Sequence, residues 1–245
     1  MRYLVTMPRY SHQADLEAAA AFMQPVKAGS DLVFHAFSPG GSLLANVMNI
    51  CWGAACDLFD AGELEGFAMI HSDVAPAEAG WLDALHEQML EHKADVLSVV
   101  APIKDERGLS STAVDDTGNL WRPRRLTMKE LKGLPPVFTS ADVGAPLLIN
   151  TGLMVVKFGS WCDRICFTVR DMIEKGPDGL RRAMAQSEDW DFSRQCHCLG
   201  LKVAATRTLK LHHHGDYGWS NQGSWGWETD RMNRKAELVK EAVPA

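Results

Sequence analysis

Three short groups of polar residues in this sequence could do chemistry, and each one borders a predicted strand or helix. His71-Ser72-Asp73 follows an apolar run, Glu188-Asp189 stands at the start of a helical segment, and His212-His213-His214 ends a strand-like segment before Gly215. Carboxylates and imidazoles are the side chains that bind divalent cations and move protons. The sequence therefore directs attention to cation binding and acid–base chemistry.

Asp73 comes directly after a strand that the sequence predicts to be buried. The run from Phe67 to Ile70 is apolar, and Pro76 cannot continue a central strand. The carboxylate is thus delivered to the carboxyl edge of a sheet, where ligands bind in open α/β proteins. There it could hold a hard cation, which in turn could hold phosphate. The structural alternative is an Asp that caps a strand–helix turn.

Glu188 and Asp189 have an equally simple structural explanation. Ser187 is a favourable N-cap, and acidic residues in the first turn of a helix suit its dipole. The three histidines differ, because alternate residues of a strand face opposite ways. His213 should therefore point away from His212 and His214, so the three cannot all bind one ion. We expect at least one of them to contact a metal or a phosphate.

The elements that must position these groups alternate between strands and helices, which predicts an α/β fold. The expected strands are 3–7, 31–37, 67–70, 95–101, 147–156, 202–205 and 209–214. The expected helices are 14–23, 43–59, 77–93, 161–175 and 186–199. Residues 102–146 have the composition of an irregular insert with a hairpin-like turn at 115–119. Residues 220–227 suit a mobile aromatic flap, and 226–245 a C-terminal helical tail after a single domain, 1–225.

Composition excludes some classes of function. The chain has 245 residues, 46% hydrophobic and 23% charged, with no visible linker, which favours one globular domain. A net charge of −6 argues against nucleic acid as a partner. No apolar run is long enough for a membrane span, and the first strand does not have the pattern of a signal peptide. The six cysteines lack a CxxC pair, which predicts reduced thiols and a cytoplasmic protein.

The order of the motifs resembles a known family. The motifs are Ile70-His71-Ser72-Asp73, Asn150-Thr151-Gly152-Leu153-Met154, Ser187-Glu188-Asp189-Trp190-Asp191-Phe192 and His213-His214-Gly215. Together they resemble the GT-A fold glycosyltransferases, especially the small bacterial enzymes related to family 2, over about residues 1–220. The resemblance implies an α/β, GT-A (Rossmann-like) fold with a mixed, mainly parallel sheet flanked by helices. His71 stands where the family has the first Asp of Asp-x-Asp. No Gln-x-x-Arg-Trp stretch follows the Glu188-Asp189 motif, so a processive polysaccharide synthase is not expected.

The resemblance also implies a reaction and a set of residues. The reaction is an inverting transfer of a sugar from a nucleotide-diphosphate sugar to an unknown sugar, lipid or protein acceptor. Asp73 and His213 would bind a divalent cation, Mn²⁺ or Mg²⁺. Asp189, with Glu188 second, would be the base, and burial must raise its pKa against the helix dipole. The expected donor contacts are Arg9, Asn46, His71, Asp73 and Trp219.

Two other functions remain open on the sequence. A sugar-phosphate nucleotidyltransferase would share the half-sheet, but it needs a glycine-rich loop after the first strand, and Met7-Pro8-Arg9-Tyr10 has no glycine. A non-catalytic nucleotide- or sugar-binding module would have the same pocket without a base. That function is favoured if Asp189 points away from the pocket.

Overall fold

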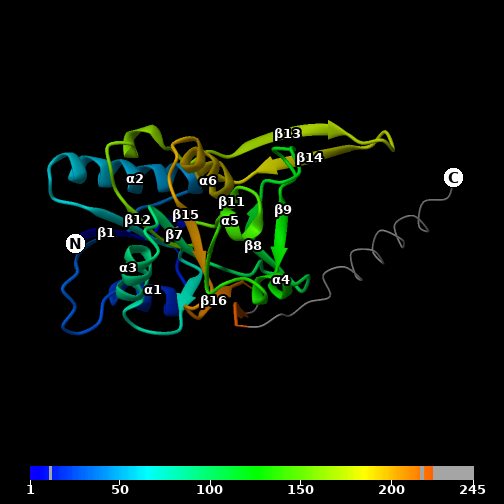
Figure 1. The fold of residues 1–245 in the computed structure, drawn as a ribbon. Coiled ribbons are helices and arrows are strands. Elements are labelled where there is room, and N and C mark those ends of the chain that lie inside the picture. The colour runs from blue at the N-terminus through cyan, green and yellow to red at the C-terminus, as the bar shows by residue number, and fades with distance from the viewer. Residues whose placement is uncertain (11–12, 216–217, 223–245) are drawn as a thin grey trace.

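The computed structural model describes residues 1–10, 13–215 and 218–222, and it shows a mixed α/β fold around one large sheet (Figure 1). The strands of this sheet are β1 (Arg2–Thr6), β3 (Val33–Phe37), β5 (Gly66–Ile70), β7 (Val96–Val99), β10 (Val137–Thr139), β12 (Leu153–Lys157) and β15 (Val203–Thr206). Their order is β10-β15-β7-β12-β5-β1-β3. All except β10 and β12 run in one direction, which confirms the expected mixed, mainly parallel sheet.

Helices cover both faces of the sheet. The helices are α1 (Leu16–Met23), α2 (Leu44–Asp60), α3 (Trp81–Glu91), α4 (Met128–Lys132), α5 (Ser140–Val143) and α6 (Glu188–Cys198), with a 3₁₀ turn η1 (Cys162–Arg164). In β5, Phe67 and Met69 pack in the core layer under α2 and α6, whereas Ala68 and Ile70 pack in the layer with α1 and α3. Figure 1 shows these two pairs of helices on opposite sides of the sheet. The apolar run is fully buried because both of its faces are covered.

Trp52 organises the core under α2. Its ring contacts Phe158 at a centroid distance of 4.7 Å and Phe67 at 5.1 Å. Its indole N–H donates to the Cys162 carbonyl at 2.8 Å, so the polar end of the side chain is satisfied although the residue is only 3% exposed. This hydrogen bond holds η1 against α2.

Four smaller sheets accompany the large one in the part of the chain that the structure describes. Their remaining strands are β2 (Arg9–Tyr10), β4 (Gly40–Gly41), β6 (Val74–Pro76), β8 (Leu109–Val114), β9 (Arg124–Thr127), β11 (Leu147–Leu148), β13 (Arg170–Lys175), β14 (Arg181–Gln186), β16 (Leu211–His214) and β17 (Gly218–Ser220). They form the sheets β11-β8-β9, β13-β14, β17-β16-β6 and β2-β4. The sheet that contains β6 and β16 joins the residues after β5 to the histidine triplet, and it is the one that builds the site.

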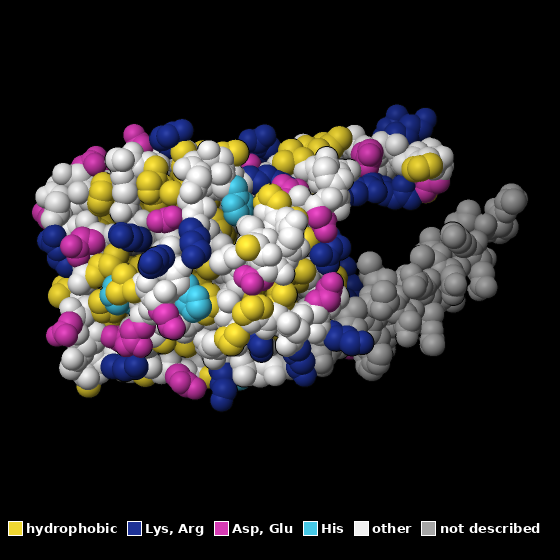
Figure 2. Space-filling view, viewed as in Figure 1, with side chains coloured by type: hydrophobic (Ala, Val, Ile, Leu, Met, Phe, Trp, Pro, Cys, Tyr) yellow, Lys and Arg dark blue, Asp and Glu magenta, His cyan; other side chains and the backbone are white. Residues whose placement is uncertain are grey.

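The helix predicted over 161–175 is wrong. After the short turn η1, the chain enters the antiparallel hairpin β13–β14, which projects from the body of the protein (Figure 1). The turn is closed by Gly176 N–H donating to the Leu180 carbonyl at 2.8 Å. Because the hairpin projects, Ile173 and Leu180 are 70% and 63% exposed. Figure 2 shows hydrophobic and basic side chains along this arm.

Two other expectations are refined. Residues 102–146 are more regular than predicted, since they contain β8, β9, α4, β10 and α5, although the expected turn at 115–119 does connect β8 and β9. The strand predicted over 147–156 is divided by residues 149–152 into β11 and β12, which belong to different sheets. The tail 226–245 and residues 223–227 of the expected flap lie outside the described residues. In the part that the structure describes, no helix has both the length and the apolar character needed to cross a membrane.

Candidate functional site

The small sheet β17-β16-β6 brings the first and third polar groups of the sequence together. The link 71–73 leaves β5 at its carboxyl end and leads into β6, which pairs antiparallel with β16. His213 is opposite Val74 in this pairing, and the His214 N–H donates to the Asp73 carbonyl at 2.7 Å. Asp73 is therefore held beside the histidine triplet by backbone hydrogen bonds.

Asp73 and His213 face each other in a geometry that suits a cation. Nε2 of His213 lies 3.7 Å from Oδ2 of Asp73. Nδ1 of the same ring lies 2.7 Å from the Pro102 carbonyl oxygen, which can only accept, so Nδ1 carries the proton. In the neutral imidazole the lone pair of Nε2 then points to a carboxylate. Two electron-pair donors that face each other are the arrangement that a metal ion bridges, and the carbonyl supplies the usual outer contact of a metal-binding histidine.

Lys104 currently provides the positive charge for this pair. Its ammonium group hydrogen bonds to Oδ2 of Asp73, and both side chains are about one third exposed, at 35% and 37%. Burial would raise the pKa of Asp73, but its contacts with His213, His71 and Lys104 outweigh that effect and hold the pKa well below its usual range. Asp73 is thus ionised at neutral pH, as a cation ligand must be.

The segment between β11 and β12 connects Asp73 to the second polar group. Asn150 is 3% exposed, its Nδ2 donates to the Val99 carbonyl at 2.9 Å, and its Oδ1 accepts from Gly152 N–H at 3.0 Å. This turn holds Thr151 so that its hydroxyl donates to Oδ1 of Asp189 at 2.5 Å. The same hydroxyl lies 3.5 Å from Nε2 of His71. Asp189 is therefore bound by the turn between β11 and β12, and Thr151 lies between it and His71.

Glu188 and Asp189 are half-buried, and their pKa values are both raised. Burial is the main cause for each, and the neighbouring charge of Asp189 adds to it for Glu188. The Thr151 hydrogen bonds and the charge of Arg125 oppose the shift at Asp189. A raised pKa is what the assignment of a base at this position requires. Burial also lowers the pKa of His71, although Asp73 and Glu188 oppose that effect.

Arg125 is a further cation at this site, near Asp189. Its guanidinium group lies over the Trp190 ring at 4.6 Å from the centroid, and it donates to the Ser110 carbonyl at 3.1 Å. Thr151 and Lys104 were missed as individual residues, although the 150–152 motif was noted.

The remaining donor contacts predicted from the sequence lie on elements around the same edge of the sheet. β1 and β5 run in parallel and end together, and the half-buried Arg9 follows β1, donating to the Ser38 carbonyl at 2.9 Å. Asn46 is exposed in the first turn of α2. Trp219 is the cross-strand partner of His213, so the two side chains lie on one face of the small sheet. The topology therefore places all three near this edge.

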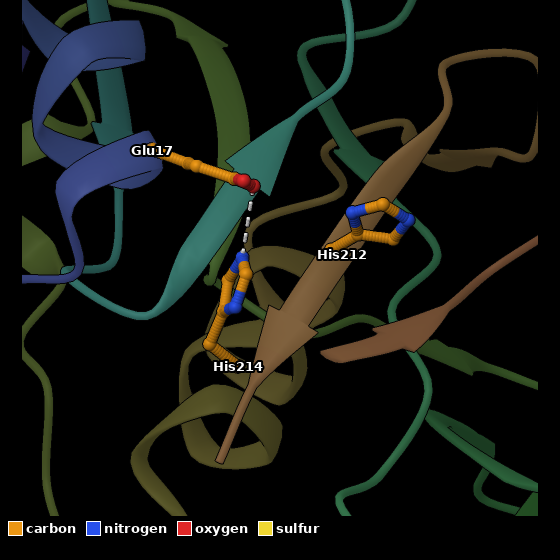
Figure 3. A group of neighbouring side chains, drawn as sticks. All are labelled: Glu17, His212 and His214. Atoms are coloured by element: carbon orange, nitrogen blue, oxygen red, sulfur yellow. Dashed lines mark ion pairs between the residues drawn. The ribbon is translucent and has the colours of Figure 1, made fainter. Parts of the chain in front are cut away.

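A second set of three side chains could hold a metal ion, and the sequence alone did not predict it. One ligand atom each from Glu17, His212 and His214 lies within 4.8 Å of the others. Figure 3 shows Glu17 extending from α1 toward His214, with His212 on the same strand. Alternate residues of a strand share a face, so the sequence indicated that His212 and His214 lie together. It did not indicate that Glu17 of α1 lies beside them.

Comparison with known proteins supports the fold. No family model and no curated protein matches this sequence. Among solved structures, the fold is similar to that of A197 from STIV, with a TM-score of 0.53 and 19% sequence identity over 94% of this chain and 95% of that chain. The similarity extends over nearly the whole chain and concerns the α/β fold alone.

Proposed function

We propose that this protein is a GT-A type glycosyltransferase that moves a sugar from a nucleotide-diphosphate sugar to an acceptor hydroxyl. The observation that carries the proposal is the meeting of Asp73 and His213, 3.7 Å apart, at the carboxyl edge of the sheet. The mixed, mainly parallel sheet and the raised pKa values of Glu188 and Asp189 are consistent with it.

In this proposal Asp73 and His213 hold the divalent cation, Mn²⁺ or Mg²⁺. Their chemistry fits such an ion, since an ionised carboxylate and a neutral imidazole nitrogen face the same point. When bound, the cation neutralises charge on the diphosphate leaving group. Lys104, which pairs with the Asp73 carboxylate, would also supply positive charge to a diphosphate bound beside that carboxylate.

The base in the proposal is Asp189, with Glu188 as the second candidate. The carboxylate removes the proton of the acceptor hydroxyl while the oxygen forms a bond to the anomeric carbon, and the bond from that carbon to the diphosphate oxygen breaks. The Thr151 hydroxyl and backbone N–H both donate to Asp189, at 2.5 and 3.2 Å, so its orientation is fixed before substrate binds. Transfer from one face to the other inverts the anomeric configuration.

The other predicted contacts would complete the donor site. Arg9 would pair with phosphate, Asn46 would contact the nucleotide, and His71 would contact the ribose or, indirectly, the metal ion. Trp219 lies on the same face of the small sheet as His213, where it could pack on a sugar ring. These positions favour a nucleotide-sugar site over a bare metal site.

Activity with nucleotide sugars tests the proposal. We expect Mn²⁺-dependent hydrolysis or transfer of at least one nucleotide sugar by the wild-type protein, and its loss in Asp73→Ala. Asp171→Asn, an exposed acid on the projecting hairpin, is the matched control and should behave as wild type. Equal turnover by wild type and Asp73→Ala would count against the proposal. Binding without turnover, unchanged in Asp189→Asn, would favour the non-catalytic module, and formation of a nucleotide sugar from a sugar phosphate would favour the nucleotidyltransferase.

A further inference from the structure

A second group of possible ligands lies on the opposite face of β16 from His213. His212 and His214 are two residues apart on the strand, and their ring centroids are 6.1 Å apart. Glu17, in the first turn of α1, completes a group whose ligand atoms all lie within 4.8 Å of one another (Figure 3). None of these side chains takes part in the proposed glycosyl transfer.

His214 is the centre of this group and its contacts are specific. Nε2 is shielded from solvent and makes no hydrogen bond, yet Oε2 of Glu17 lies 3.4 Å away. On the other side of the ring, Nδ1 lies 3.7 Å from Oδ2 of Asp15. A shielded imidazole nitrogen that faces a carboxylate without a hydrogen bond is expensive in the absence of a ligand. A cation between Nε2 and Oε2 would satisfy both atoms.

We propose that Glu17, His212 and His214 form a binding site for Zn²⁺ or a similar borderline cation. Two ligands that each bind Zn²⁺ at about 2.0–2.1 Å in a tetrahedron lie ~3.4 Å apart, which is the separation of Glu17 and His214 here. Two imidazoles and a carboxylate are a known zinc ligand set that leaves the fourth position for water. Because a hard cation prefers oxygen ligands, this set favours Zn²⁺ over Mg²⁺ or Ca²⁺.

Asp15 has two functions in this arrangement. Its Oδ1 caps α1, accepting from Glu17 N–H at 2.9 Å. Its Oδ2 lies 3.7 Å from Nδ1 of His214, so the carboxylate favours a proton on Nδ1, which leaves Nε2 free to bind the cation. The site therefore has a carboxylate beside the ring nitrogen that would not bind the cation.

The cation would connect α1 and β16, the two elements that hold the link 71–73. The Asp15 N–H donates to the Ser72 carbonyl at 2.7 Å, so the start of α1 is already tied to the link 71–73. Connecting Glu17 of α1 to β16 would hold both sides of the Asp73 link at once. The bound ion is thus a structural support for the donor pocket, separate from the ion that Asp73 and His213 hold.

Zn²⁺ binding by the untagged full chain, without nucleotide, tests the proposal. Zn²⁺ content would be measured by mass spectrometry after removal of free metal, and affinity by competition with a chromophoric chelator. The variants are His212→Ala, Glu17→Gln and Asp15→Asn, and circular dichroism would verify that each folds. Asn is also a good N-cap, so Asp15→Asn changes the outer contact while keeping the helix start. His35→Ala, an exposed histidine on β3, is the matched control, and His213→Ala removes the other candidate site.

The expected results separate the two sites. Wild type, His35→Ala and His213→Ala retain one tightly bound Zn²⁺ that raises the melting temperature, whereas His212→Ala and Glu17→Gln lose it. Asp15→Asn binds ~10-fold more weakly. The proposal is overturned if wild type retains no Zn²⁺, if folded His212→Ala and Glu17→Gln bind it as tightly as wild type, or if only His213→Ala loses it. Because no nucleotide is used, these results do not depend on whether the protein transfers sugars.

Discussion

Nε2 of His213 lies 3.7 Å from Oδ2 of Asp73, although one residue follows β5 and the other lies on β16. The antiparallel pairing of β6 with β16 produces this proximity. The tautomer that the Pro102 carbonyl imposes makes Nε2 a lone-pair donor rather than a proton donor in the neutral ring. The negative charge of Asp73 is balanced by the ammonium group of Lys104.

Lys104→Met should strengthen Mn²⁺ binding in the absence of nucleotide. The substitution removes a positive charge from the Asp73 carboxylate and keeps the length of the side chain. A unit charge at ~4 Å in a solvated setting is worth about 1 kcal/mol, which corresponds to an about five-fold change in affinity. Isothermal titration with Mn²⁺ measures it, and Lys157→Met, which removes an exposed lysine at the end of β12, is the control. Weaker binding by Lys104→Met would mean that the lysine does not compete with the cation.

The rate of transfer should fall as the pH is lowered, at a pH above the ordinary range of a carboxyl group. Burial raises the pKa of both Asp189 and Glu188, and a base must be ionised to accept a proton. kcat/KM therefore rises with pH through the raised pKa and levels off above it. A profile that is flat down to the pKa of an ordinary Asp, near 3.9, would exclude both residues as the base.

Thr151→Val should move this rise to still higher pH. The Thr151 hydrogen bonds are the main influence that lowers the pKa of Asp189, and valine removes the hydroxyl while keeping the shape and the backbone N–H. Thr151→Ser keeps the hydroxyl and should restore the wild-type profile. Comparing kcat/KM against pH for the three proteins measures the shift. If Glu188 is the base instead, Thr151→Val should leave the profile where it was.

Gly152→Ala should destabilise the protein through the turn between β11 and β12. A methyl group there would lie 3.0 Å from Oδ1 of Asn150 and 3.2 Å from Cγ2 of Val74, and Asn150 is fixed by its bond to the Val99 carbonyl. Overpacking of this kind costs about 1–3 kcal/mol. Gly53→Ala is the control, since a methyl group in that exposed part of α2 meets no atom within 4 Å and should stabilise the helix. Urea denaturation measures the free energy of unfolding of both variants. Equal stability of Gly152→Ala and wild type would show that the turn shifts to accommodate the methyl group.

The fold could be predicted where one signal dominates the local sequence. The run from Phe67 to Ile70 is apolar on both faces because helices cover both sides of β5, and the pattern shows it directly. The segment 161–175 misled because Ile165, Val169, Met172 and Ile173 have helical spacing by coincidence. The turn sequence Gly176-Pro177-Asp178-Gly179, between two segments of six residues each, was the stronger indication of a hairpin.

The site could be predicted only as a list of side chains. Asp73 follows a strand, His213 lies near the end of one and Asp189 lies in the first turn of a helix, and the topology of an α/β sheet gathers such positions at one edge. Thr151, Lys104 and Arg125 lie in segments whose paths depend on long-range pairing, so no local pattern reveals their contacts. The same applies to Glu17, whose position next to β16 is set by the packing of α1 and not by its neighbours in the chain.

Titration of nucleoside diphosphates into the protein, with and without Mn²⁺, tests the central claim most directly. The claim is that Asp73 and His213 hold one divalent cation which binds the diphosphate. At least one member of a set containing UDP, GDP, ADP and CDP should bind wild type only when Mn²⁺ is present, and Asp73→Ala and His213→Ala should both abolish that binding. Binding that is indifferent to Mn²⁺, or that survives unchanged in Asp73→Ala, would contradict the claim.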